Sequence, residues 1–130
     1  MRIKLTSIMV DNQDKALKFY TDVLGFRKKV EIPVGEYRWL TVVSPEGPDD
    51  VELSLEPNAN PAGRAFQDAM FAQGIPIAAF EVANMDDEYA RLKSKGVAFT
   101  QPPTRSGPIV MAVFADTCGN LIQMYQPPSS

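Results

Sequence analysis

The sequence predicts an α+β fold made of two βαβββ modules, whose curled mixed sheets form a cup. The first observation is a repeated plan: a strand, an amphipathic run and a glycine turn occupy 3–26 and recur over 75–97. The second is the apolar–polar alternation that ends each copy, over 51–55 and 121–125. Such alternation is typical of a half-buried strand. A duplicated module of this kind favours a pseudo-symmetric container for a ligand.

The first module is predicted to span residues 1–57. Its opening strand covers 3–10, and a helix follows over Asp14–Val23 because apolar residues recur there at helical spacing. Asp11 and Asn12 offer N-caps, and Gly25 ends the helix. Three further strands are predicted at 27–34, 37–44 and 51–56, with a hairpin turn at 34–36 and a loop at 45–50.

A linker with a short helix at 62–73 occupies residues 58–73, and the second module then spans 74–126. Its helix is predicted at 85–95, with Asn84 as the cap. Asp116 is expected to hydrogen-bond the backbone of a turn at 116–120, in which Gly119 takes a positive φ. The predicted strands are 75–82, 97–101, 109–115 and 121–126, with a loop at 102–108 and a frayed tail at 127–130.

Composition limits the classes of function. The chain has 130 residues, 45% of them hydrophobic and 22% charged, which is ordinary for one globular domain. A net charge of −3 argues against nucleic-acid binding, and no apolar run approaches the roughly 20 residues that span a bilayer. The N-terminus lacks a signal-peptide pattern and Cys118 has no partner for a disulfide, so a cytoplasmic location is expected.

Histidine is absent from the chain. This removes the commonest general base and the commonest transition-metal ligand. A nucleophilic role for Cys118 would need such a base, so we predict a free thiol in a turn instead.

Several segments carry a resemblance to a known family. They are Val10-Asp11, Phe19-Tyr20, Leu24-Gly25-Phe26, Ala79–Val82 and Phe114–Gln123. In this order, they resemble the vicinal oxygen chelate superfamily, which includes glyoxalase I, extradiol dioxygenases and bleomycin-resistance proteins. The last segment is similar to the family ending F-x-D-P-x-G-N-x-I-E, with Thr117 in place of proline and Gln123 in place of glutamate.

The resemblance implies a divalent metal held by one side chain from each of four strands. The matching positions here are Leu5, Glu52, Ile77 and Gln123. Leu5 and Ile77 cannot ligate a metal, and one carboxylate with one amide is a poor site for zinc, nickel or iron. Mg²⁺ usually needs substrate phosphates as well. We therefore predict no metal and no other cofactor.

The candidate ligand-binding residues are Arg38, Trp39, Glu52, Gln123 and Tyr125. Glu52 is either a pocket carboxylate, with Arg38 as its cationic partner, or a solvated strand residue. Arg38 and Trp39 are adjacent, so strand alternation sends them to opposite faces and only one is expected to line the cavity. Gln123 and Tyr125 share a face, and Tyr125 either meets the ligand or fills the core.

Three functions stay open. The first is a metal-free binding protein of the bleomycin-resistance type, expected to be a homodimer, that captures a small organic ligand in the cup or between two subunits. The second is a metal-dependent lyase, isomerase or dioxygenase with Glu52 as its catalytic residue. The third is a stress-related or interaction protein whose cavity is vestigial. Glyoxalase I activity is disfavoured because two expected ligand positions are aliphatic.

Overall fold

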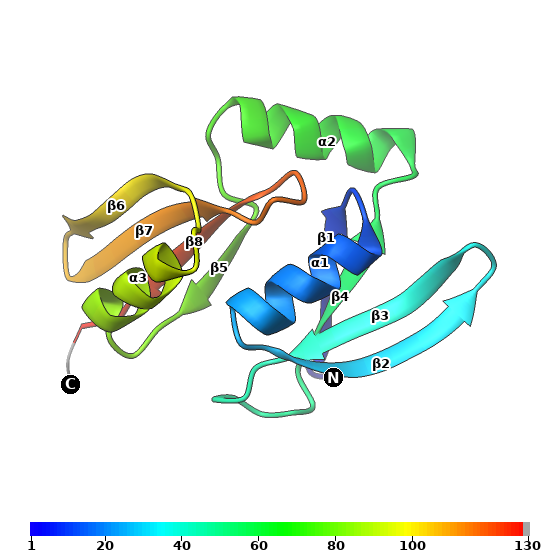
Figure 1. The fold of residues 1–130 in the computed structure, drawn as a ribbon, viewed down its shortest axis with the longest axis horizontal. Helices are drawn as coiled ribbons and strands as arrows, with labels where there is room; N and C mark the ends of the chain where they lie inside the picture. Colours follow the sequence, from blue (N-terminus) through cyan, green and yellow to red (C-terminus); the bar gives the residue numbers. More distant parts are fainter. Residues whose placement is uncertain (129–130) are drawn as a thin grey trace.

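Two four-stranded mixed sheets form the framework of the chain (Figure 1). The computed structural model describes residues 1–128, so the end of the predicted tail, 129–130, lies outside the described residues. In each sheet the first two strands are parallel and the others antiparallel. The sheet orders are β1 (Leu5–Val10), β4 (Glu52–Pro57), β3 (Tyr37–Val43), β2 (Arg27–Val34), and β5 (Ala78–Glu81), β8 (Leu121–Gln126), β7 (Ile109–Ala115), β6 (Phe99–Ser106). The predicted repeat and fold class are confirmed.

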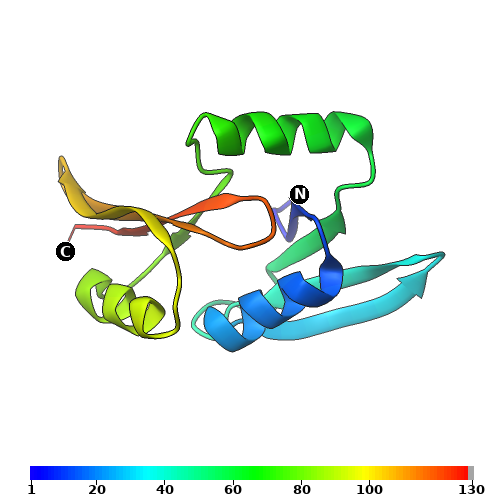
Figure 2. The ribbon, with the colours of Figure 1, turned by 45° about the horizontal axis from the view of Figure 1, so that its top comes forward.

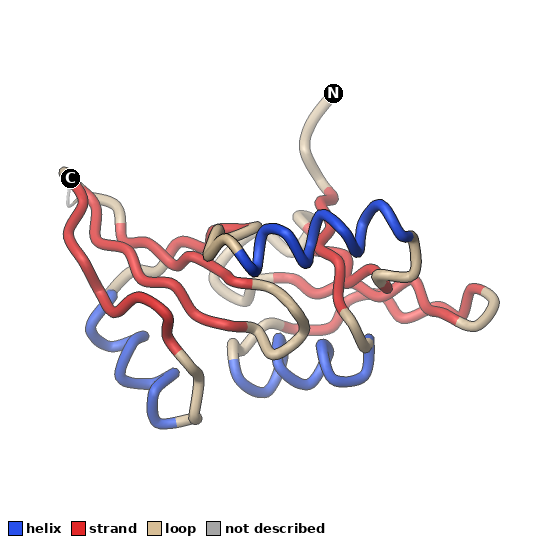
Figure 3. The backbone as a smooth tube through the Cα atoms, turned by 90° about the horizontal axis from the view of Figure 1, so that it is seen from above, coloured by secondary structure: helices blue, strands red, loops and turns tan. Residues whose placement is uncertain are grey.

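The helices lie on both sides of the strands. Figure 3 shows α1 (Gln13–Lys18) and α3 (Met85–Ser94) on one side and α2 (Pro61–Ala72) on the other. The side chains of Asn12 and Asn84 cap α1 and α3, as predicted, by accepting the N–H groups of Lys15 and Asp87 at 2.9 and 3.0 Å. The predicted helix over Asp14–Val23 divides into α1 and a π-helical turn, η1 (Phe19–Val23).

The two modules pack through their helix-facing sides. The two sheets do not join into one, because β1 and β5, which are edge strands, do not pair with each other. Instead, buried side chains of both modules form one core. The ring of Phe26 meets that of Phe80 edge-on at 5.2 Å between centroids, and Phe19 lies 6.2 Å from Phe114. Figure 2 shows the two modules side by side, with α2 spanning them.

Strand β6 is longer than the sequence predicts. It continues through Pro102 and Pro103, which the sequence analysis assigns to a loop. Proline lacks an N–H donor and is tolerated in a sheet only at an edge or a bulge. β6 is the edge strand of its sheet, and its register shifts on both sides of Gln101. In contrast, β5 covers only Ala78–Glu81 of the predicted strand at 75–82.

One buried side chain fixes α2 to both modules. Gln67 is 2% exposed and satisfies its amide through four partners. Its Nε2 donates to the carbonyls of Met9 and Cys118 and to Asn120 Oδ1, and its Oε1 accepts from Asn58 Nδ2. The connecting helix is therefore an integral part of the fold and not a loose linker.

Candidate functional site

Each sheet has one side that faces α1 or α3 and an opposite side, called the open side here, part of which α2 covers in the first sheet. In β3, Leu40 and Val42 belong to the core, so strand alternation turns Trp39 and Thr41 to the open side. Trp39 is 45% exposed there. Of the adjacent pair Arg38 and Trp39, the tryptophan is thus the one on the open face.

Glu52 lies at the start of β4 on the same open side. It is half-buried and stands opposite Leu5 in the parallel register of β1 and β4. The hydroxyl of the buried Thr41 donates to the Glu52 carboxylate at 2.7 Å. This contact holds the carboxylate in one orientation without a cation.

Arg38 lies on the opposite face and does not meet Glu52, so the predicted ion pair is wrong. Its guanidinium binds Asp14 and Glu31, each at 2.7 Å. The hydrogen bond that Arg38 donates to Asp14, and then the one it donates to Glu31, raises the pKa of Arg38. Lys28 and Arg38 together lower the pKa of Glu31. Strand alternation separates Arg38 from the face that carries Glu52.

Gln123 and Tyr125 share the open side of the second sheet. In the register of β5 and β8, Ala79 stands opposite Gln123 and Glu81 opposite Tyr125. Ala79, and not Ile77, therefore holds the place that Leu5 holds opposite Glu52 in the first module. Leu5 and Ala79 thus occupy equivalent positions in the two modules, and both are aliphatic.

The four positions do not fit a divalent metal. Leu5 and Ala79 have no donor atom, which leaves the Glu52 carboxylate and the neutral Gln123 amide. Transition metals in proteins prefer imidazole, thiolate and several carboxylates. Across residues 1–128, no three His, Cys, Asp or Glu side chains gather closely enough to hold a metal ion.

A cleft of about 920 Å³ separates the two modules. It opens where the end of η1, the loop after β3, the start of β4, the end of β5 and the first turns of α3 meet. Its apolar lining includes Phe26, Leu53, Phe80, Leu92 and Met124. Five segments distant in the sequence therefore assemble this cavity.

Of the predicted ligand-binding residues, Glu52 is the one that the described structure places in the lining of this cleft. Trp39, Gln123 and Tyr125 lie on the open faces, and Arg38 contributes to a small polar pocket near α1. The role of Glu52 as a ligand-binding or catalytic residue stays a prediction. The rest of the lining was missed, although Gly25 beside Phe26 marked the turn that shapes one wall.

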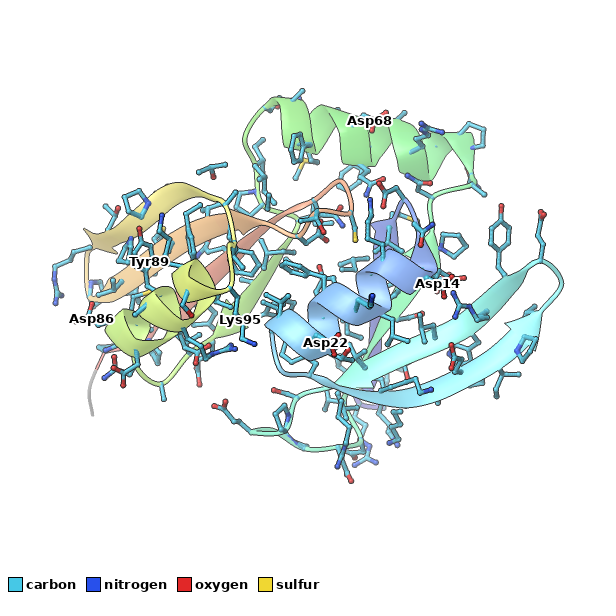
Figure 4. The ribbon with its side chains drawn as sticks, in the orientation of Figure 1. Asp14, Asp22, Asp68, Asp86, Tyr89 and Lys95 are labelled. Atoms are coloured by element: carbon cyan, nitrogen blue, oxygen red, sulfur yellow. The ribbon has the colours of Figure 1, made fainter. Side chains whose placement is uncertain are left out.

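The wall formed by α3 is tied to the first module. Arg91 donates to the carbonyls of Val23 and Leu24, at 2.8 and 3.2 Å, and also binds Glu88. Its pKa is raised, chiefly by the hydrogen bond to Glu88. Near this wall, Lys95 donates to the carbonyl of Asp22, and Figure 4 shows the two residues facing each other where α3 approaches η1.

A second buried polar cluster is structural. Tyr20 donates to Asp116 Oδ2 at 2.7 Å, and Asp116 Oδ1 accepts the backbone N–H groups of Cys118 and Asn120. The predicted turn contacts of Asp116 are confirmed, as is the positive φ of Gly119. Burial, with the nearby Asp116 charge, raises the pKa of Cys118 to about 12. The neutral thiol is a poor nucleophile.

Comparison with known proteins supports one family. A family model described as Glyoxalase/Bleomycin resistance protein/Dioxygenase superfamily matches residues 2–124. The uncharacterized protein YurT of Bacillus subtilis (strain 168) is 53% identical over 97% of this chain and 99% of its own length.

Two solved structures share the fold along nearly the whole chain. The crystal structure of UcmS2 has a TM-score of 0.82 at 33% identity, with 96% of this chain and 97% of that chain covered. TnmS3, an antibiotic binding protein from Streptomyces sp. CB03234, has a TM-score of 0.77 at 27% identity, with 98% and 96% covered. No helix among the described residues has the length and apolar character needed to cross a membrane.

Proposed function

Because the chain belongs to the Glyoxalase/Bleomycin resistance protein/Dioxygenase superfamily, we propose that it binds a small organic molecule without a metal ion. The cleft between the modules carries this proposal. Its volume of about 920 Å³ lies within the range of small-molecule sites, and its lining is largely apolar. The similarity to TnmS3, an antibiotic binding protein, supports the same class of activity.

The cleft supplies the two elements that such binding needs. Apolar side chains of both modules, Phe26 from the first and Phe80 from the second, offer surface that a ligand would cover. Burial of apolar surface contributes roughly 25 cal/mol per Å². Glu52, whose carboxylate accepts a hydrogen bond from Thr41, is a polar residue beside this apolar surface.

The side chains at the family's ligand positions support metal-independent binding. Leu5 and Ala79 have no lone pair to donate, and each stands directly opposite the polar residue of its module. A metal bound by Glu52 and Gln123 alone would keep most of its ligands as water. Binding therefore depends on shape and apolar contact.

A thermal-shift screen tests this proposal. Protein treated with EDTA is screened against antibiotics and aromatic metabolites, and we expect some of them to raise the melting temperature. Val82→Arg, which places a long side chain in the cleft lining on the same face as Phe80, should abolish these shifts. Ala65→Arg on the exposed side of α2 is the matched control and should preserve them. No stabilising compound, or equal shifts in both variants, would contradict the proposal.

A homodimer is part of the proposed function. The open side of the first sheet exposes apolar residues that a soluble monomer would usually cover: Leu5 (50%), Ile32 (48%), Val34 (60%) and Trp39 (45%). The outer edges of β1 and β5 are also free for pairing in the described chain. A second copy of the chain has the same apolar face and the same free strand edges. We therefore propose that a second copy covers this face.

A catalytic role for Glu52 is the second candidate. The observation that favours it is a carboxylate held by Thr41 at a residue that borders the cleft. Turnover of a family substrate with added divalent metal, lost in Glu52→Gln, would support a lyase, isomerase or dioxygenase. Unchanged turnover in that variant would reject the role.

A further inference from the structure

We infer that Arg91 is a positioning residue for ligand binding, which holds the cleft wall at 24–26 in place from the other module. The inference rests on the proposed function and names a residue on which the shape of that site depends. Arg91 acts on the ligand through this wall segment, 24–26, which belongs to the cleft lining. A π-helical turn in the first module and two basic side chains of the second carry the inference.

The helix of the first module is one residue longer than its counterpart in the second. Each helix begins after an asparagine cap, Asn12 or Asn84, and ends at a glycine with positive φ. The two glycines are Gly25, at φ +89°, and Gly96, at φ +83°. Twelve residues, 13–24, lie between cap and glycine in the first module, and eleven, 85–95, in the second.

The π turn η1 accommodates the extra residue. In it the N–H of Leu24 donates to the carbonyl of Phe19, five residues earlier, at 3.0 Å. Such a turn holds one residue more than an α-helical turn, and π turns are frequent at functional sites. Leu24 is followed directly by Gly25 and Phe26, and all three line the cleft. The extra residue therefore helps to set where the wall segment stands.

The last carbonyls of this helix are bound by the other module. Carbonyls at a helix C-terminus lack donors within the helix, and positive charge is favoured at that end. Arg91 donates to the carbonyls of Val23 and Leu24 at 2.8 and 3.2 Å. Lys95 donates to the carbonyl of Asp22 at 3.1 Å. Side chains of α3 thus cap three successive carbonyls across the module interface.

Arg91 and Lys95 differ in their relation to the cleft. Arg91 borders the cleft, and its ion pair with Glu88 at 2.9 Å holds the guanidinium in one orientation. A planar guanidinium can bind two carbonyls and a carboxylate at once, whereas an ammonium is a single point of charge. Lys95 and Asp22, which face each other in Figure 4, lie outside the cleft lining of the described chain. Loss of Arg91 should therefore release the wall segment, and loss of Lys95 should not.

Arg91→Met and Lys95→Met are a matched pair, since each removes one positive charge from α3 or its C-terminal end and leaves an unbranched side chain. The probe is N-phenyl-1-naphthylamine, an uncharged apolar dye that fluoresces on binding, or the best compound of the thermal-shift screen if the dye does not bind. We expect Arg91→Met to bind the probe roughly 2- to 10-fold more weakly, the cost of ordering one side chain on binding. Lys95→Met should bind it as the wild type does. Arg91→Lys keeps the charge and can cap one carbonyl, so it should recover part of the affinity.

Hydrogen exchange of the ligand-free full chain measures the wall segment directly. The N–H groups of Gly25 and Phe26 donate to carbonyls of η1, at 3.0 and 2.9 Å. They should exchange about 10-fold faster in Arg91→Met than in the wild type, because hydrogen bonds from a charged group no longer hold this turn closed. In Lys95→Met their exchange should stay close to that of the wild type.

The outcomes separate this inference from the proposed function. Weaker probe binding with unchanged exchange would mean that Arg91 contacts the ligand itself, and would overturn the positioning role. Faster exchange with unchanged affinity, or equal effects of the two methionine substitutions, would overturn it as well. In each of these cases small-molecule binding stands. If the wild type does not bind the dye and the thermal-shift screen finds no compound, the proposed function fails and the inference fails with it.

Discussion

At the scale of single residues, the contact between Tyr20 and Asp116 joins η1 to the turn between β7 and β8. Tyr20→Phe removes the hydroxyl that donates to Asp116 Oδ2, although Asn120 still donates to that oxygen at 2.8 Å. We expect a loss of about 1–3 kcal/mol in the free energy of unfolding, measured by urea denaturation. Tyr89→Phe is the control, because no hydrogen bond of the Tyr89 hydroxyl is found among the described residues. Equal stability of the two variants would contradict this role.

The thiol of Cys118 should be inert in the folded protein. It is fully buried, and its pKa rises from 9.0 to about 12. Alkylation by iodoacetamide at pH 8 should be slow in buffer and fast in urea. The folded state binds the thiol proton more tightly than the unfolded state. The contribution of Cys118 to the free energy of unfolding is therefore fully present below pH 9 and is lost as the pH rises toward 12. Rapid alkylation of the native protein would contradict this assignment.

Residue-level prediction from the sequence works for local contacts and fails for the face of a strand. Asn12, Asn84 and Asp116 bind backbone groups within four residues, so their neighbours in the chain determine their roles. The partners of Arg38 come from α1 and β2. Strand alternation predicted that Arg38 and Trp39 lie on opposite faces of the sheet. Which of the two lies on the face that α1 covers depends on where the helix packs, and the local sequence does not show this.

At the scale of elements, the turn between β7 and β8 depends on a glycine that fits against α2. Gly119 has φ +99°, and a Cβ there would lie 2.8 Å from Gln67 Nε2. Gly119→Ala should lower the free energy of unfolding by roughly 2–4 kcal/mol, from backbone strain together with the clash. Gly107→Ala has φ +60° and open space around its Cβ, so it should cost only about 1–2 kcal/mol. Equal losses would show that the contact with Gln67 is unimportant.

Prediction of the elements from the sequence fails where pairing with a partner strand determines whether a segment forms a strand or a loop. Pro102 and Pro103 indicated a loop, yet β6 continues through them because it lies at a sheet edge. Position in the sheet is set by long-range pairing, which the local pattern does not contain. The helices were predicted better, since their asparagine caps and terminal glycines are local signals.

At the scale of the whole molecule, the exposed apolar face of the first sheet predicts a dimer. Multi-angle light scattering should give about twice the chain mass of 14.3 kDa. Trp39→Glu puts a charge on that face and should produce monomers. Ala90→Glu adds the same charge on exposed α3 and should leave the dimer intact. A monomeric wild-type protein would contradict the proposed homodimer.

The repeat in the sequence predicted the modules but not how they dock. Each module follows from its own periodicity, whereas the cleft depends on helix-side packing between Phe26 and Phe80. Glu52 could be predicted because a family motif marks it. Glu46 belongs to no motif, and only the arrangement of the modules brings its loop to the cleft.

The central claim is that this cleft binds an organic molecule without a metal ion. Isothermal titration of EDTA-treated protein with the best compound from the screen tests it most directly, with a parallel titration after zinc or nickel is added. The account predicts binding with the same Kd in both titrations. Binding that appears only after the metal is restored would contradict it.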